Sequence, residues 1–312
     1  MSKVLKGLAA LLVLAVAAAA GGLLWLRHAN SPQVEGELEL AVLSAPVRVL
    51  RDEIGVPYLF AANTPDLLRA QGFVTAQHRL MQMELFRATW RGELSAALGE
   101  ATLPSDIRMR VLGIRRNGER HAAKLSPESR AFFQHYVDGV NAYVADHAAD
   151  HPLELKAVGL APRAWSVADL VALVHFIHYT HATNFKAEVV AQKLIDQLGA
   201  ERAREIFPLT LIADAAPGPT AAAGPGRAST AAAIADLGVD WGRLLVAPET
   251  LGPQGLGSNN WAVGPSRSAS GRAMVANDPH LDNRILPGTW HPVGLFAPGI
   301  QAVGAALPGM PG

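Results

Sequence analysis

Leu256-Gly257-Ser258-Asn259-Asn260-Trp261 is the stretch that decides the fold, and Asn277-Asp278-Pro279-His280-Leu281 follows it further along the chain. Residues 258–263 and 273–276 carry β-compatible, partly apolar side chains, and the turn formers of residues 264–271 separate them. The two runs are therefore predicted to form an antiparallel hairpin. Folding it about Arg267-Ser268 places Ser258 opposite Asn277 or its neighbours, with His280 just past the end of the ladder.

Ser258 has the chemistry of a nucleophile that is exposed by cutting its own peptide bond. A serine hydroxyl needs a neighbouring base. The α-amino group of a new N-terminal serine can be that base, because its pKa of about 7.7–8.0 leaves a useful neutral fraction at physiological pH. Gly257 lacks a Cβ and so lets the Ser258 Oγ approach the carbonyl before it. As an isolated dipeptide, Gly257-Ser258 fits an ordinary turn equally well.

Several stretches occur in the same order as in the penicillin acylase family of N-terminal-nucleophile amidohydrolases, from about Val47 to Gly312. This family includes penicillin, cephalosporin/glutaryl and acyl-homoserine-lactone acylases. His78 stands where an Asp is usual, and Tyr58 stands where a His is common. The stretches that carry the resemblance are Arg51–Pro57, Gln71–Glu84, Arg91–Ser95 with Leu98-Gly99, Gly257–Trp261, Ala276–Leu281 and Val303–Gly312.

The resemblance implies an α+β fold, the αββα sandwich of the N-terminal-nucleophile hydrolases, with antiparallel sheets between helical layers. It divides the chain into a signal peptide or membrane anchor (residues 1–29), a mainly helical α-subunit region (30–213), a spacer (214–257) and the start of a β-subunit region (258–312). The Ala/Gly/Pro-rich composition of the spacer agrees with a linker. Most of the β subunit is then missing, so the sandwich is expected to be incomplete and the 312-residue chain inactive.

The activity that the resemblance implies is hydrolysis of a linear amide, either a β-lactam side chain or another N-acyl substrate. Ser258 would be the nucleophile and supply the α-amino base, and cleavage between Gly257 and Ser258 would yield the α and β chains of one precursor. His280 would help to position the nucleophile. Glu188 would be one ligand of a structural calcium ion, and no organic cofactor is expected.

The N-terminus predicts export from the cytoplasm. Lys3 and Lys6 precede an uncharged run over residues 7–26, which resembles an export signal. A run of that length could also cross a bilayer as an anchor. Both alternatives place the remaining chain in the periplasm or elsewhere outside the cytoplasm, and the second anchors it in the inner membrane through residues 7–26.

Composition excludes other classes of protein. Lys and Arg together number 27, as do Asp and Glu, and no basic stripe suggests nucleic acid as a partner. Cysteine is absent, which rules out disulfide frameworks and thiol chemistry.

Helices are predicted for most of the α-subunit region. Thr64-Pro65-Asp66 begins one that runs to Trp90, Ser126-Pro127-Glu128 begins a second, and Ser166 with Asp169 resembles a capping box for a third. A fourth spans residues 187–198. Residues 37–40, 47–50 and 56–60 are predicted to be strands. The expected inward side chains are Leu68, Phe73, Leu80, Met83 and Phe86 in the first helix, and Phe132, Phe133, Tyr136, Val140 and Tyr143 in the second.

His175, His178 and His181 support a rival hypothesis. His175 and His178 share one face of the third helix. Because each residue turns the helix by 100°, His181 lies off that face. A membrane-anchored, extracytoplasmic binding module that holds a metal through His175 and His178 is therefore the alternative to an acylase.

Overall fold

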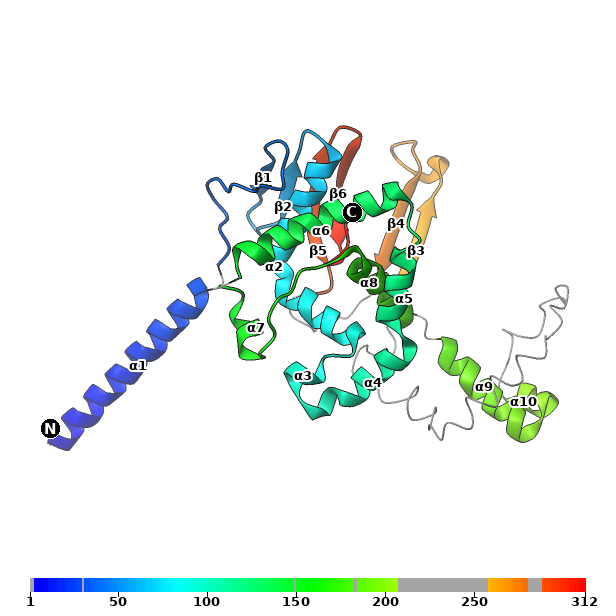
Figure 1. Cartoon of the computed structure of the whole chain (residues 1–312), viewed down its shortest axis with the longest axis horizontal. Helices are drawn as coiled ribbons and strands as arrows, with labels where there is room; N and C mark the ends of the chain where they lie inside the picture. The colour runs from blue at the N-terminus through cyan, green and yellow to red at the C-terminus, as the bar shows by residue number, and fades with distance from the viewer. Residues whose placement is uncertain (1–2, 30, 149, 182–183, 207–257, 280–287) are drawn as a thin grey trace. The chain divides into compact units, whose positions relative to one another are not determined.

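The computed structural model describes residues 3–29, 31–148, 150–181, 184–206, 258–279 and 288–312 (Figure 1). The chain divides into two compact units, Met1–Val174 with Asn283–Gly312, and His175–Asp282. Helices and strands occur in both, so the predicted α+β class is confirmed. The predicted spacer, residues 214–257, lies outside the described residues.

The first unit contains a four-stranded sheet in the order β1 (Arg48–Arg51), β2 (Pro57–Phe60), β5 (His291–Ala297) and β6 (Ile300–Ala306). The pairs β1–β2 and β5–β6 are antiparallel, but β2 and β5 run parallel. The prediction of purely antiparallel sheets is therefore wrong for this pair. The physical reason is that β2 and β5 are separated by a long crossover, which parallel pairing requires.

Helices cover one face of this sheet. Leu59 and Leu295 are paired across β2 and β5 and are buried, and α2 packs against both strands. On the other face, Leu50 is 46% exposed and Val303 is 65% exposed. The described residues alone do not form a four-layer sandwich, so that arrangement stays a prediction.

Helix α2 (Thr64–Arg91) confirms the longest predicted helix. It begins one residue earlier than expected, because Asn63 and not Thr64 is the N-cap: the Asn63 Oδ1 accepts the Asp66 amide at 2.7 Å. Asp66 is fully buried and accepts hydrogen bonds from the Ser44 amide and hydroxyl, the Ala45 amide, Asn63 and Arg69. This carboxylate therefore fixes the loop before β1 on the first turn of α2.

Helix α6 (Pro127–Asp146) crosses α2 closely, and the two helices lie side by side in Figure 1. Its N-cap is Ser126, as predicted, and Tyr136, Val140 and Tyr143 are buried. Phe132 was predicted to point inward but is 39% exposed, because it lies in the first turns of the helix, before the buried stretch begins. On α2, Leu68, Phe73, Leu80 and Met83 are buried as predicted, and Phe86 is half-buried.

Shorter helices complete the first unit. The capping box before α8 is confirmed, since the Ser166 amide donates to the Asp169 carboxylate at 3.0 Å and the Asp169 amide donates to the Ser166 Oγ at 3.3 Å. Only the first half of α8, up to Val174, lies in this unit. The helices are α3 (Ser95–Leu98), η1 (Glu100–Thr102), α4 (Leu103–Leu112), α5 (Ile114–Ala122), α7 (Leu153–Ala157) and α8 (Val167–His181).

The second unit holds α9 (Asn184–Leu198), α10 (Ala200–Ile206) and a separate two-stranded sheet. Helix α9 confirms the fourth predicted helix, and Gly199 follows it with a φ of 78°. The sheet consists of β3 (Ser258–Val263) and β4 (Met274–Pro279), joined through η2 (Pro265–Arg267).

The N-terminal helix α1 (Lys3–Ala29) includes the predicted export segment. Among the described residues, none of the helices combines the length and the apolar character that crossing a membrane demands, and the predicted anchor is not supported. Residues 37–40, predicted to be a strand, form none. Leu38 is 46% exposed, so the apolar face that the alternation implied is not buried.

Candidate active site

The hairpin of β3 and β4 confirms the antiparallel arrangement predicted around Ser258. Ser258 is the first residue of β3, and its partner is Pro279 at the end of β4. Asn277 pairs with Asn260 instead of with Ser258. The register therefore differs by two residues from a direct Ser258–Asn277 pair, because the turn sets which residues face each other. Pro279 has no backbone N–H to donate. The ladder therefore ends at Ser258.

Polar side chains share a face of this hairpin. Because side chains alternate along a strand, Ser258 and Asn260 project from the same face of β3, and Asn277 lies opposite Asn260 on that face. Asn277 is thus a diagonal neighbour of Ser258, and such neighbours lie roughly 7–8 Å apart, with their Cβ atoms somewhat closer. Ser258 is exposed, as are Asn260 and Asn277. The arrangement offers an accessible hydroxyl with amide groups one step along the sheet.

The other residues proposed from the sequence are only partly described. Gly257 and His280 lie outside the described residues, directly before β3 and directly after β4. Glu188 lies on α9, and only its backbone is described. The structure therefore confirms the strands that flank the predicted nucleophile and leaves the roles of Gly257, Ser258, His280 and Glu188 as predictions.

The rival metal hypothesis finds no support in the described part of the chain. His175 and His178 lie on α8, as predicted; His175 is half-buried and His178 is exposed. No group of three or more His, Cys, Asp or Glu side chains in the described ranges could hold a metal ion. Two imidazoles without further ligands do not complete a transition-metal site.

A second polar cluster, which the sequence did not predict, lies in the first unit. The His78 Nδ1 on α2 and the His291 Nε2 at the start of β5 are 3.0 Å apart, with their rings nearly perpendicular. Burial, together with the positive charges of Arg51 and Arg79, lowers the pKa of His78 to about 4. Burial, His78 and Arg79 lower the pKa of His291 to about 3. Both imidazoles are therefore neutral at physiological pH.

Arg79 attaches the chain before β5 to the same stretch of α2. Its guanidinium donates to the Gly288 carbonyl at 2.9 Å and to the Trp290 carbonyl at 3.1 Å. The Gln82 side chain also donates to the Gly288 carbonyl. The one signal in the sequence was that His78 stands where relatives usually have Asp. Its contact with His291 joins positions 213 residues apart, which no local pattern predicts.

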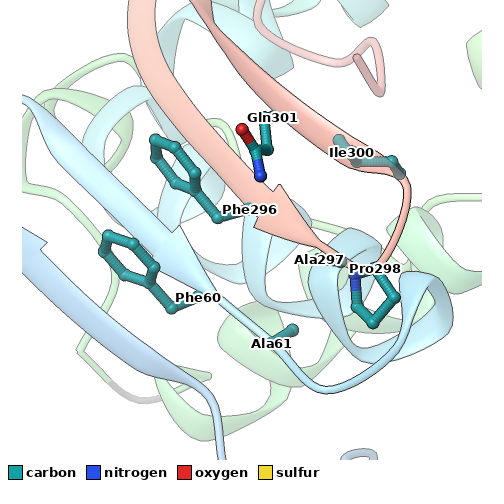
Figure 2. A pocket seen from close by; sticks show the side chains of 7 residues that line it. All are labelled: Phe60, Ala61, Phe296, Ala297, Pro298, Ile300 and Gln301. Carbon is teal, nitrogen blue, oxygen red and sulfur yellow. The ribbon is translucent and has the colours of Figure 1, made fainter.

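A shallow hollow of about 430 Å³ lies at the edge of the four-stranded sheet, on its uncovered face (Figure 2). The rings of Phe60 on β2 and Phe296 on β5 stack at 4.6 Å, and Arg48 lies over the Phe60 ring. No acid, base or nucleophile is among the residues that line it, so this hollow offers apolar contact and no chemistry. These residues are Phe60, Ala61, Phe296, Ala297, Pro298, Ile300 and Gln301.

Comparison with known proteins identifies the family. The family model described as penicillin amidase matches residues 46–312, which is most of the chain. The chain belongs to the penicillin amidase family. The resemblance read from the sequence is therefore confirmed, and the match includes both the α2 region and the β3–β4 hairpin.

Individual relatives are acylases. The chain is 30% identical over 292 residues to an acyl-homoserine lactone acylase of Pseudomonas aeruginosa, covering 92% of this chain and 34% of that protein. It is 33% identical over 287 residues to the penicillin acylase 2 proenzyme of a Pseudomonas species, covering 91% and 36%. With the penicillin G acylase of Escherichia coli it shares 26% over 322 residues, covering 86% and 37%.

Among solved structures, the thermostable penicillin G acylase of Alcaligenes faecalis matches with a TM-score of 0.45 and 29% identity. The match covers 56% of this chain and 96% of that one. The chain spans about a third of the length of the curated relatives it matches.

Proposed function

We propose that Ser258 is the N-terminal nucleophile of an amidohydrolase that acts on a linear amide. The observation that carries this proposal is the place of Ser258 at the first position of β3, opposite Pro279, where the ladder ends. A cut between Gly257 and Ser258 would leave every described pair of the hairpin in place. It would also leave a free α-amino group on the residue that carries the hydroxyl.

Maturation begins when the Ser258 Oγ attacks the Gly257 carbonyl carbon. The C–N bond breaks as an ester forms, and the Ser258 nitrogen takes up the hydroxyl proton. Water then hydrolyses the ester, which leaves a carboxylate on Gly257 and restores the hydroxyl. The bonds that form and break belong to these two residues and to water, and the attack needs a backbone conformation that brings the Oγ close to the carbonyl, which Gly257 favours.

In turnover, the α-amine of Ser258 accepts the proton of its own Oγ as that oxygen attacks the substrate carbonyl. The protonated amine then gives its proton to the leaving amine. Water attacks the acyl-serine ester in the second half, with the same amine as base, and releases the carboxylic acid. His280, which follows the partner of Ser258 directly, serves to position the nucleophile.

The substrate class that we propose is a β-lactam side chain amide or another N-acyl compound, in line with relatives named as penicillin acylases and acyl-homoserine lactone acylases. The precursor would yield an α and a β chain, as the word proenzyme in a relative's name suggests. Lys3 and Lys6 before the uncharged residues 7–26 support export to the periplasm.

A structural calcium ion is a separate part of the proposal. The ion takes six to eight oxygen ligands, and the described residues gather no such group. Residues in the described part of the chain therefore do not form the site by themselves. Glu188 is proposed as a single ligand, and no step of the chemistry depends on the ion.

Amidase activity tests the nucleophile. The assay uses residues 1–312 continued by the remaining segment of the acyl-homoserine lactone acylase that they match, with a chromogenic N-acyl substrate. Ser258→Ala should remove activity to background, because alanine has no attacking oxygen. Ser266→Ala, an exposed serine in η2 of the same hairpin, and His178→Ala should retain it. Full activity in Ser258→Ala would refute the proposal.

A further inference from the structure

The pair formed by His78 and His291 joins α2 to the first residue of β5, inside a cluster whose other charged groups are cations. His291 is 3% exposed, and its Nδ1 is buried without a hydrogen-bond partner. Arg79 on α2 faces both rings, and Arg51 on β1 faces His78. Arg51 is itself held by Gln77 at 2.8 Å. All groups that act on the pair electrostatically therefore oppose a further positive charge.

The pair keeps its hydrogen bond most easily when both rings are neutral, as the protons on the four ring nitrogens show. The neutral pair has two protons, one of which lies in the hydrogen bond between the His78 Nδ1 and the His291 Nε2. If a third proton is added and this hydrogen bond is kept, the His291 Nδ1 must carry a proton. That nitrogen is buried and faces no acceptor. A fourth proton places two N–H groups against each other at 3.0 Å and ends the bond.

We propose that the His78–His291 pair is an acid-sensitive latch, which holds residues 288–297 on α2 when neutral and releases them when protonated. The adjacent contacts define what is released. Arg79 holds the carbonyls of Gly288 and Trp290, and β5 pairs with β2 beyond them. A second positive charge next to Arg79 disfavours these contacts as well. The latch works whether or not Ser258 is a nucleophile.

The direction of the pH dependence follows from the free energies of protonation. The pKa of each imidazole falls from 6.5 to about 4 for His78 and about 3 for His291 when the segment is attached. Between these pKa values and pH 6.5, the two histidines therefore bind more protons when the segment is detached than when it is attached. The contribution of the latch is fully present above pH 6.5 and is lost progressively as the pH falls toward 4.

Hydrogen–deuterium exchange of the full chain measures the release directly. Rates are corrected for the intrinsic pH dependence of amide exchange, and a peptide from β5 and β6 is compared with one from α6. Between pH 7 and pH 5 the protection of the β5–β6 peptide should fall by about tenfold or more, while α6 keeps its protection. A β5–β6 peptide whose protection is unchanged between these pH values would overturn the latch.

Two variants separate the latch from general acid sensitivity. His291→Phe keeps an aromatic ring but removes one of the two titrating groups, so the loss of protection at pH 5 should be at least about threefold smaller than in the wild type, with His78 responsible for the remainder. His78→Asp places a carboxylate next to His291, which stabilises its protonated form, so protection should increase as the pH falls from 7 to 5.5. His121→Gln, which removes an exposed histidine on α5, should behave as the wild type. The same pH profile in wild type and both variants would refute the proposal.

Discussion

Glu84, Arg87 and Trp165 form a buried ionic cluster between α2 and the chain before α8. The Arg87 guanidinium contacts both Glu84 oxygens, at 2.8 and 2.5 Å, and lies 4.9 Å from the centre of the Trp165 ring. Trp165 donates its indole N–H to Glu84 at 2.9 Å. Arg87 also donates to the carbonyls of Arg163 and Ala164. One guanidinium thus contacts a carboxylate, two backbone carbonyls and an aromatic ring in this part of the core.

Replacing Arg87 should therefore cost much stability. Burial raises the pKa of Glu84 although Arg87 and Trp165 act against this, so the carboxylate without Arg87 would be a buried charge with too few partners. Arg87→Ala should lower the free energy of unfolding by about 3–5 kcal/mol. Arg115→Ala removes an arginine from an exposed pair with Glu119 and should cost about 0–1 kcal/mol. Urea unfolding of both variants measures the difference, and equal costs would contradict it.

At the residue scale, the sequence predicted local helix caps better than the register of the hairpin. It identified the capping pair Ser166 and Asp169 and the N-cap Ser126, because these motifs are local. It began the first helix with Thr64, whereas the N-cap is Asn63; both side chains can cap a helix and only the backbone conformation distinguishes them. It placed Ser258 near Asn277, but the register depends on how tightly residues 264–273 turn.

Close contact between α2 and α6 depends on two glycines. A Cβ added to Gly139 would lie 1.8 Å from the Arg69 carbonyl oxygen, and one added to Gly72 would lie 2.1 Å from the Tyr136 carbonyl oxygen. In both cases the atom in the way is backbone, so a side-chain rotation cannot relieve the clash. The two helices must move apart to admit even a methyl group.

Gly139→Ala should therefore destabilise the protein despite the higher helix propensity of alanine. Propensity favours the change by about 1 kcal/mol, whereas forcing apart packed helices costs about 1–3 kcal/mol or more. We expect a net loss of about 2 kcal/mol in the free energy of unfolding, because the overlap with backbone is severe. Gly264→Ala, where nothing lies within 4 Å, should change stability by less than about 0.5 kcal/mol. A neutral or stabilising Gly139→Ala, measured by urea unfolding, would contradict this account of the crossing.

At the scale of elements, long periodic helices and the β3–β4 hairpin were predictable. Each is defined by contacts between residues close in sequence. The sheet of the first unit was not, because β2 pairs with β5 across more than two hundred residues and no turn sets their register. Residues 37–40 show the opposite error, since their alternation predicts a strand but none of the described strands pairs with them.

At the scale of the whole molecule, the chain combines two structural elements that carry the proposals made above. Residues 288–312 are attached to the helical region by β2, Arg79 and the His78–His291 pair. They are also held at Gly312, where backbone groups exchange hydrogen bonds with the Gln71 side chain. Ser258 begins the other element, the β3–β4 hairpin. Cleavage before Ser258 would leave each of these contacts formed.

The mass of the mature chains tests the central proposal, that Ser258 becomes an N-terminal nucleophile, most directly. In the extended chain described above, intact mass and N-terminal sequencing should show a cut between Gly257 and Ser258 and a new terminus reading Ser-Asn-Asn-Trp. Ser258→Ala should abolish the cut, Ser258→Cys should retain some of it because a thiol can make the same acyl shift, and Ser266→Ala should cleave normally. We expect little cleavage in the 312-residue chain. An active chain that is never cut, or a Ser258→Ala chain that is cut as efficiently as wild type, would contradict the account.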